Sequence, residues 1–162
     1  MNILFISLGC DKNLTDTEVM LGMLSGRGYQ MTDDETQADI IIINTCCFIH
    51  DAKEESIQAI LEMAEYKKER CKALIVTGCL AQRYRQEIID EIPEVDVVIG
   101  TNSYDEILDA VDEALEGKHA LHLKELSGLP SVGSKRILTT GGHFAYLKIA
   151  EGCDKHCTYC II

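Results

Sequence analysis

The sequence predicts an α/β fold, an open and mostly parallel β-sheet flanked by helices. Short, continuous apolar runs recur along the chain, and each run is followed by a turn and then by an amphipathic segment. Continuous apolar runs are typical of parallel strands that are buried on both faces. Regular alternation of strand and helix indicates crossover connections within one sheet.

The expected strands are four strong apolar runs and one shorter run. They cover residues 2–8, 29–32, 38–43, 72–77 and 95–99. The strongest of them is residues 38–43, which contains four consecutive isoleucines. Because a strand of this kind is typical of a buried parallel sheet, we expect helices to flank the sheet.

Helices are expected after these strands. They are expected to cover approximately residues 13–26, 51–68, 81–91 and 103–115. Thr15 and Glu18 have the spacing of a capping box at the start of the first helix, and Gly26 is expected to end it. The apolar spacing of the second helix predicts that its buried face consists of Ile57, Ile60, Leu61 and Ala64.

The composition is that of a globular domain. The chain has 162 residues, of which 46% are hydrophobic and 26% are charged, enough for one domain with a sizeable core and a tail. No apolar run approaches the roughly 20 residues that span a bilayer. The first residues lack the basic flank and cleavage site of a signal peptide. We therefore expect a cytoplasmic protein with no membrane partner.

Charge and cysteine content narrow the function classes further. The formal net charge of −12 argues against direct nucleic-acid binding by this domain, since such binding needs a basic surface. The chain contains 8 cysteines. In a reducing compartment, this number points to metal binding or redox chemistry rather than to disulfides.

Three cysteines lie close together near the end of the chain. Cys153, Cys157 and Cys160 have the spacing C-x3-C-x2-C and follow residues 144–150, an apolar run expected to be a strand. Thiolates are the usual ligands of iron–sulfur clusters, and a fully ligated cubane takes four. Three ligands leave one iron open to a small molecule. The alternative is a zinc site completed by His156, although zinc sites more often use paired C-x2-C arms.

A second set consists of Cys10, Cys46 and Cys79. Each follows an expected strand at its carboxyl end, the edge at which open α/β sheets bind ligands. Glycine precedes Cys10 and Cys79, which lets the backbone come close to a bulky ligand. We therefore expect a second metal site, the alternative being that each thiol packs as a small hydrophobe.

The other cysteines give weaker signals. Cys71 lies at the start of its strand, hence at the opposite edge, and is expected to be a bystander. Cys47 is expected to point away from Cys46, and its role is left open. His50 is expected to be a polar residue near a helix start rather than a partner of the metal site. The turn at Cys10 lacks the G-x-G-x-x-G fingerprint, so nucleotide binding is not expected.

The motifs together resemble the radical S-adenosylmethionine methylthiotransferases. They cover residues 7–14, 44–46, 78–83 and 146–160, and the resemblance extends over essentially the whole chain. Residues 12–14, 52–56 and 92–96 look like the RimO-type branch, which modifies an aspartate of a ribosomal protein. The sequence departs from the pattern where it has Asp11, Cys47 and the pair Gly141 and Gly142.

The resemblance implies two 4Fe–4S clusters and S-adenosylmethionine as cofactors. Cys153, Cys157 and Cys160 would hold the radical cluster, and Tyr159 would lie near the adenine of S-adenosylmethionine. Cys10, Cys46 and Cys79 would hold an auxiliary cluster that carries the sulfur. The implied domains are the methylthiotransferase N-terminal α/β domain (1–123), a linker (124–142) and the start of a truncated radical barrel (143–162).

The implied reaction inserts a methylthio group at the β-carbon of an aspartate in a small-subunit ribosomal protein. It needs an electron donor, flavodoxin or a similar protein. We expect this chain to be inactive alone, to fold through about residue 123 and to leave residues 153–160 as an exposed tail. Two alternatives remain open, a transfer-RNA adenosine methylthiotransferase of the same family and a non-catalytic docking module that binds zinc or a cluster.

Overall fold

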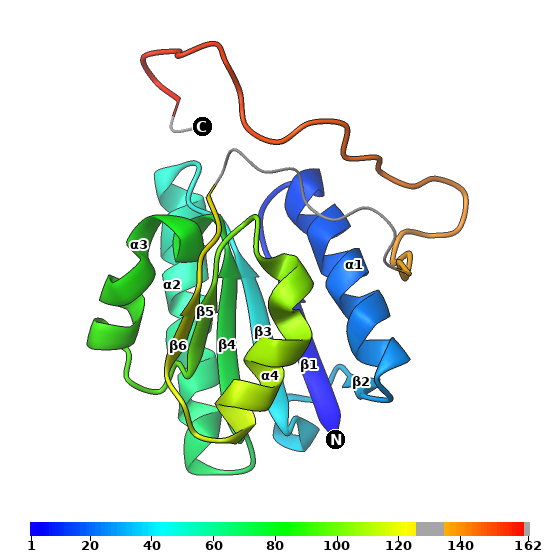
Figure 1. The fold of residues 1–162 in the computed structure, drawn as a ribbon, viewed down its shortest axis with the longest axis vertical. Helices are drawn as coiled ribbons and strands as arrows, with labels where there is room; N and C mark the ends of the chain where they lie inside the picture. The colour runs from blue at the N-terminus through cyan, green and yellow to red at the C-terminus, as the bar shows by residue number, and fades with distance from the viewer. Residues whose placement is uncertain (126–134, 161–162) are drawn as a thin grey trace.

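The fold is a single parallel sheet of six strands in the order β2-β1-β3-β4-β5-β6. The computed structural model describes residues 1–125 and 135–160 (Figure 1), so residues 126–134 of the predicted linker and residues 161–162 lie outside the described residues. The strands are β1 (Asn2–Ser7), β2 (Gln30–Thr32), β3 (Ile40–Thr45), β4 (Ala73–Gly78), β5 (Val97–Ile99) and β6 (Ala120–His122). The predicted parallel sheet is confirmed.

Helices cover both faces of the sheet, which gives three layers (Figure 1). They are α1 (Asp11–Gly26), α2 (His50–Glu65), α3 (Cys79–Glu91) and α4 (Ile107–Leu115), with short 3₁₀ turns at Glu35–Gln37, Tyr66–Lys68 and Tyr104–Glu106. Helices α1 and α4 pack on one face, and α2 and α3 pack on the other. The prediction that helices flank the sheet is therefore confirmed.

The centre of the sheet shows why the isoleucine run forms a strand. All four isoleucines of β3 are 0% exposed. Ile40 and Ile42 belong to the core under α1 and α4. Ile41 and Ile43 belong to the core under α2 and α3. A strand that alternates its side chains between two buried faces needs apolar residues at every position.

The strand order places a switch point between β1 and β3. From β1 the chain crosses to β2 on one side, and then to β3 on the other side of β1. The connections after β1 and β3 therefore diverge at the carboxyl ends of these two strands. In open α/β sheets, ligands bind in the crevice outside the strands at such a point.

The start of α1 differs from the predicted capping box. The helix begins at Asp11, and Cys10 precedes it without a side-chain cap. The Thr15 hydroxyl donates to the carbonyl of Asp11 inside the helix at 3.0 Å, and the Glu18 side chain is 0% exposed. The capping box is wrong because Glu18 binds a distant part of the chain. The predicted end at Gly26 is confirmed.

Three further differences concern weak local signals. Strand β6 was not predicted, because Ala120–His122 has only three residues and no apolar run. Leu61 is 46% exposed, so its predicted place on the buried face of α2 is wrong. Residues 144–150 form no strand, because no part of the described chain pairs with them, and Ile149 is 88% exposed.

Candidate metal centre

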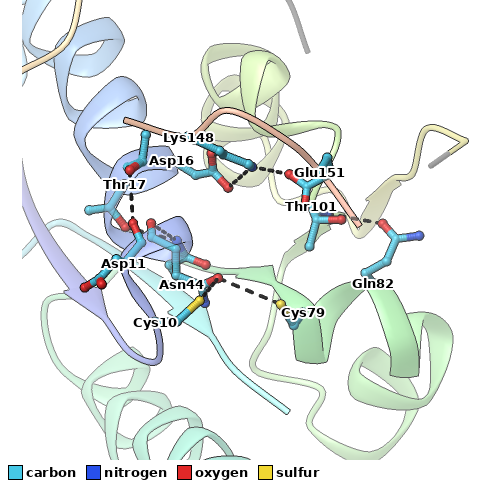
Figure 2. A network of polar contacts seen from close by, with 12 residues as sticks. Cys10, Asp11, Asp16, Thr17, Asn44, Cys79, Gln82, Thr101, Lys148 and Glu151 are labelled. Atoms are coloured by element: carbon cyan, nitrogen blue, oxygen red, sulfur yellow. Dashed lines mark hydrogen bonds and ion pairs between the residues drawn. The ribbon is translucent and has the colours of Figure 1, made fainter. Parts of the chain in front are cut away.

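The structure brings the three strand-end cysteines to one edge of the sheet. Cys10 follows β1, Cys46 follows β3 and Cys79 follows β4, and these three strands are neighbours. Figure 2 shows Cys10 and Cys79 side by side, with their sulfurs joined by dashed contacts to one oxygen. That oxygen is Oδ1 of Asn13, which lies 4.0 Å from Cys10 Sγ and 3.8 Å from Cys79 Sγ.

Cys46 lies directly behind the loop that carries Cys10. A Cβ atom added at Gly9 would lie 2.7 Å from Cys46 Cβ and 3.0 Å from Cys46 Sγ. Gly9 also has φ +94°, a backbone conformation that favours glycine. Gly9 therefore seats the Cys10 loop against Cys46, while the predicted approach of its backbone to a bulky ligand stays a prediction.

Asn13 joins the connections that carry the cysteines, and the sequence analysis did not single it out. Its side chain is 5% exposed, and its Nδ2 donates to the carbonyls of Leu8 at 3.0 Å and Thr45 at 2.9 Å. In turn, the Asn44 amide donates to the Asn13 carbonyl at 2.9 Å. The available signal was a polar residue in the first turn of a helix, three positions after Cys10.

The environment of Cys79 favours the neutral thiol. Burial raises the pKa of Cys79 to about 12, and the charges that Cys46, Cys47 and Cys10 would carry as thiolates add to this effect. A protonated Cys79 thiol can donate to Asn13 Oδ1, as the contact at 3.8 Å indicates. Because metals bind the thiolate, metal binding here would release a proton.

Among the residues that the structure describes, no group of three or more His, Cys, Asp or Glu side chains is arranged to hold a metal ion. The donor chemistry nevertheless suits a thiophilic metal, because three thiols from neighbouring strand ends lie at the switch point. Cys10 is exposed and Cys79 is partly exposed, so a metal can reach them from solvent.

The second predicted set has a different environment. Cys153 and Cys157 are exposed and Cys160 is partly exposed. The Cys160 amide donates to the Cys157 carbonyl at 3.0 Å, which closes a turn, while Tyr159 is 88% exposed. These residues thus form an exposed loop, as expected.

The segment before this loop is held by the folded domain. Lys148 binds Asp16 of α1, and Arg136 binds Glu18 of the same helix. No pattern in the sequence predicts these contacts. They place residues 135–151, which span the end of the predicted linker and the start of the predicted radical domain, against α1.

The remaining predicted residues have other surroundings. Cys71 is buried near the start of β4, and its thiol donates to the carbonyl of Ala73 at 3.2 Å. Cys47 is buried in the core that packs under α2 and α3. His50 is largely exposed and pairs with Glu54 at 3.6 Å. Cys71 and His50 thus have partners of their own, whereas Cys47 shares its core with Cys79, which packs against it.

Among the helices of the described part of the chain, none has the length and apolar character that crossing a membrane requires. This finding agrees with the absence of a long apolar run in the sequence.

Comparison with known proteins relates this chain to one family and to relatives that share one name. The model of a family described as "Uncharacterized protein family UPF0004" matches residues 2–100. The chain is 63% identical to "Ribosomal protein uS12 methylthiotransferase RimO" of Lachnoclostridium phytofermentans, over 100% of this chain and 37% of that protein. It is 51% identical to the protein of the same name from Acetivibrio thermocellus, over 97% of this chain and 36% of that protein.

The chain thus spans little more than a third of the length of these relatives. Among solved structures, a de novo designed Rossmann 2x3 fold protein has a TM-score of 0.43 and 18% identity, over 76% of this chain and 95% of that chain. The family match covers most of the sheet and all three strand-end cysteines. The chain belongs to the family UPF0004, and within this family it is an N-terminal domain of the RimO type.

Proposed function

We propose that this chain is the N-terminal part of an enzyme that transfers a methylthio group to ribosomal protein uS12, and that Cys10, Cys46 and Cys79 hold an iron–sulfur cluster in it. The convergence of these thiols at the switch point of the sheet is the observation that carries the proposal. The names of the relatives supply the reaction and the substrate.

The chain's own residues have defined tasks in this proposal. Asn13 binds the backbone carbonyls of Leu8 and Thr45, at the points where the chain leaves β1 and β3. These bonds fix the backbone just before Cys10 and Cys46. Cys79 must lose its proton before it can bind a metal, and its burial makes this loss unfavourable without one. When bound, a cluster with an open iron would supply a place to carry the sulfur that is inserted into a C–H bond.

The second cysteine set has a separate place in the proposal. Cys153, Cys157 and Cys160 would bind a second 4Fe–4S cluster that activates S-adenosylmethionine, with Tyr159 beside the adenine. These side chains are exposed or partly exposed in the described structure, so protein beyond this chain would supply the walls of that pocket. The accompanying division is an α/β domain at 1–123, a linker at 124–142 and the start of a radical domain at 143–162.

Several partners follow from the same proposal. A flavodoxin or similar protein would deliver electrons to the second cluster, and the reaction would take place in the cytoplasm, where ribosomal proteins are found. The net charge of −12 supports a basic protein substrate over direct nucleic-acid binding by this domain.

The experiment is anaerobic reconstitution with iron and sulfide, followed by metal analysis and Mössbauer spectroscopy. We compare the unaltered chain with two triple variants, C10A/C46A/C79A and C153A/C157A/C160A. The proposal expects iron to be retained in C153A/C157A/C160A and lost in C10A/C46A/C79A, because this chain is expected to hold the strand-end cluster at most. If iron follows only the tail set, the strand-end cysteines are packing residues and the sulfur-carrying role fails. Stoichiometric zinc without iron would favour a docking module instead.

The substrate is tested separately on a full-length protein that carries this domain. We expect methylthiolation of an aspartate in a uS12 peptide, read as a mass increase on that residue. Parallel incubation with transfer RNA tests the competing reaction. Modification of adenosine with no change in the peptide would overturn the proposed substrate while leaving the proposed cluster intact.

A further inference from the structure

Helix α1 buries a carboxylate that binds a segment far along the chain. The Glu18 side chain is 0% exposed, and its Oε2 lies 2.5 Å from an Arg136 guanidinium nitrogen. Its Oε1 accepts from the Thr139 amide at 2.6 Å and from the Thr139 hydroxyl at 2.9 Å. The Ile137 amide donates to the Glu18 carbonyl at 3.0 Å. Glu18 thus binds the segment through both side chain and backbone.

A second carboxylate of α1 binds the same segment further along. Lys148 Nζ donates to both oxygens of Asp16, at 2.9 Å and 2.8 Å, and it also pairs with Glu151. The Lys148 side chain is only 10% exposed, and its Nζ lies 5.7 Å from the centre of the Tyr104 ring. Figure 2 shows Lys148 between Asp16 and Glu151, on the segment that crosses this edge of the sheet.

The surface of α1 is also shaped for this segment. A Cβ atom added at Gly22 would overlap the backbone carbonyl of Lys135. A glycine inside a helix is unfavourable unless a close approach requires it. Gly22 therefore supplies the space that the backbone at residue 135 occupies, and together with Glu18 and Asp16 it gives α1 three contacts with residues 135–151, which we name the strap.

The same helix contacts two of the strand-end cysteines. Asn13 lies in the first turn of α1 and contacts both Cys10 and Cys79 through its amide oxygen. Asp16 and Glu18 follow within about one and a half turns, since an α-helix has 3.6 residues per turn. One rigid element therefore connects the strand-end cysteines to the strap, and the strap leads directly into the loop of Cys153.

We propose that Asp16 and Glu18 are positioning residues that fix the strap, and with it the loop of Cys153, Cys157 and Cys160, at a set distance from Cys10, Cys46 and Cys79. This inference rests on the proposed function, in which two metal centres serve one substrate. Two reacting groups must be held in register for a transfer to proceed. Ion pairs with little exposed surface suit this task, because a strap that leaves its place would strand a charge in the protein.

The test measures the distance between the two cysteine sets in the metal-free, reduced chain. Homobifunctional maleimides with graded spacer lengths are allowed to link Cys10 to the exposed Cys153 and Cys157, and the linked peptides are identified by mass spectrometry. We compare the unaltered chain with E18Q, D16N and the double variant. The matched control is D112N, which removes an exposed pair between Arg27 of α1 and Asp112 at 2.6 Å.

In the unaltered chain and in D112N, we expect cross-links from a narrow set of spacer lengths. In E18Q and D16N that set should broaden and the yield at the preferred length should fall severalfold, with faster amide hydrogen exchange across 135–151. The conservative variant D16E should restore the narrow set. Continued protection of the buried Cys71 from alkylation shows that the domain is still folded.

Identical spacer profiles in all variants, or no cross-link at any length in the unaltered chain, would overturn the inference. The iron analysis of the two triple variants is independent of this result. If iron does not follow Cys10, Cys46 and Cys79, the proposed function fails, whereas the cross-linking profile still decides whether Asp16 and Glu18 fix the strap.

Discussion

Glu18 of α1 and Arg136, separated by 118 positions in the sequence, form an ion pair of 2.5 Å in which the carboxylate has no exposed surface. Burial opposes ionisation of this carboxyl, but hydrogen bonds from Thr139 and Arg136 outweigh it, so the pKa of Glu18 is lowered. The charged form is therefore the stable one at neutral pH. A helix that packs on the sheet thus also serves as the anchor for a later part of the chain.

Two glycines of α1 provide a matched pair of substitutions. Gly26→Ala places its Cβ where nothing lies within 4 Å, so we expect it to be neutral or to stabilise by up to about 1 kcal/mol through helix propensity. Gly22→Ala should lose that gain, because its Cβ overlaps the carbonyl of Lys135. Thermal unfolding and hydrogen exchange at Ile137 measure the two effects. If Gly22→Ala stabilises as much as Gly26→Ala and Ile137 stays protected, the strap does not pack on Gly22.

Asn13→Ala tests whether the polar centre of the site also stabilises the fold. The substitution leaves the carbonyls of Leu8 and Thr45 without their donor, and we expect a loss of about 2 kcal/mol or more, since each buried carbonyl left unpaired costs about 1–3 kcal/mol. Asn2→Ala is the control, because its side-chain bond to Gln37 is exposed, and it should cost less than about 0.5 kcal/mol. Urea unfolding followed by circular dichroism compares them. Equal losses would show that the buried Asn13 amide stabilises the fold no more than the exposed Asn2 amide does.

The sheet was predictable because its signal is local. Each central strand is apolar on both faces, so the isoleucine run at residues 40–43 identifies a strand without knowledge of its neighbours. The strand-end position of Cys10, Cys46 and Cys79 then follows from topology, since parallel strands end at one edge. For these residues, the apolar pattern of the sequence and the strand order of the sheet lead to the same position.

The contacts of the strap were not predictable in this way. Glu18 carries a spacing typical of a capping box, and only the position of Arg136 in space reveals its actual partner. Asn13 gives no signal beyond its residue type, because its role depends on carbonyls from two different connections. The short strand β6 is selected by pairing with β5 rather than by its own composition.

The pair of hydrogen bonds at His122 predicts a pH dependence of stability. Its Nδ1 lies 2.9 Å from Glu106 and its Nε2 lies 2.8 Å from Glu113, and two carboxylate partners require both ring nitrogens to be donors. Burial opposes the charged ring, but the bonds to Glu113 and Glu106 outweigh it and raise the pKa of His122 above 6.5, although Lys124 also pairs with Glu106.

A raised pKa means that this stabilisation is complete below the unfolded value of about 6.5 and is lost as the pH rises through the folded value. We therefore expect the unfolding free energy of the unaltered chain to exceed that of H122Q most at about pH 6, with the difference shrinking toward about pH 9. Chemical unfolding at several pH values measures this. Glu116→Gln controls for net charge on the same surface. A difference that grows with pH would contradict the assignment.

The cysteines should differ widely in their rates of alkylation in the metal-free chain. The thiolate is the reacting form, and burial raises the pKa of Cys47, Cys71 and Cys79, whereas Cys10 is exposed. An iodoacetamide time course read by mass spectrometry should therefore modify the exposed Cys10, Cys153 and Cys157 first and the buried Cys71 last, with similar rates for all in urea as the control. Anaerobic loading with iron and sulfide should then slow Cys10 while leaving Cys71 unchanged. If Cys10 reacts equally fast after loading, it does not bind the metal, and the strand-end site loses its most accessible ligand.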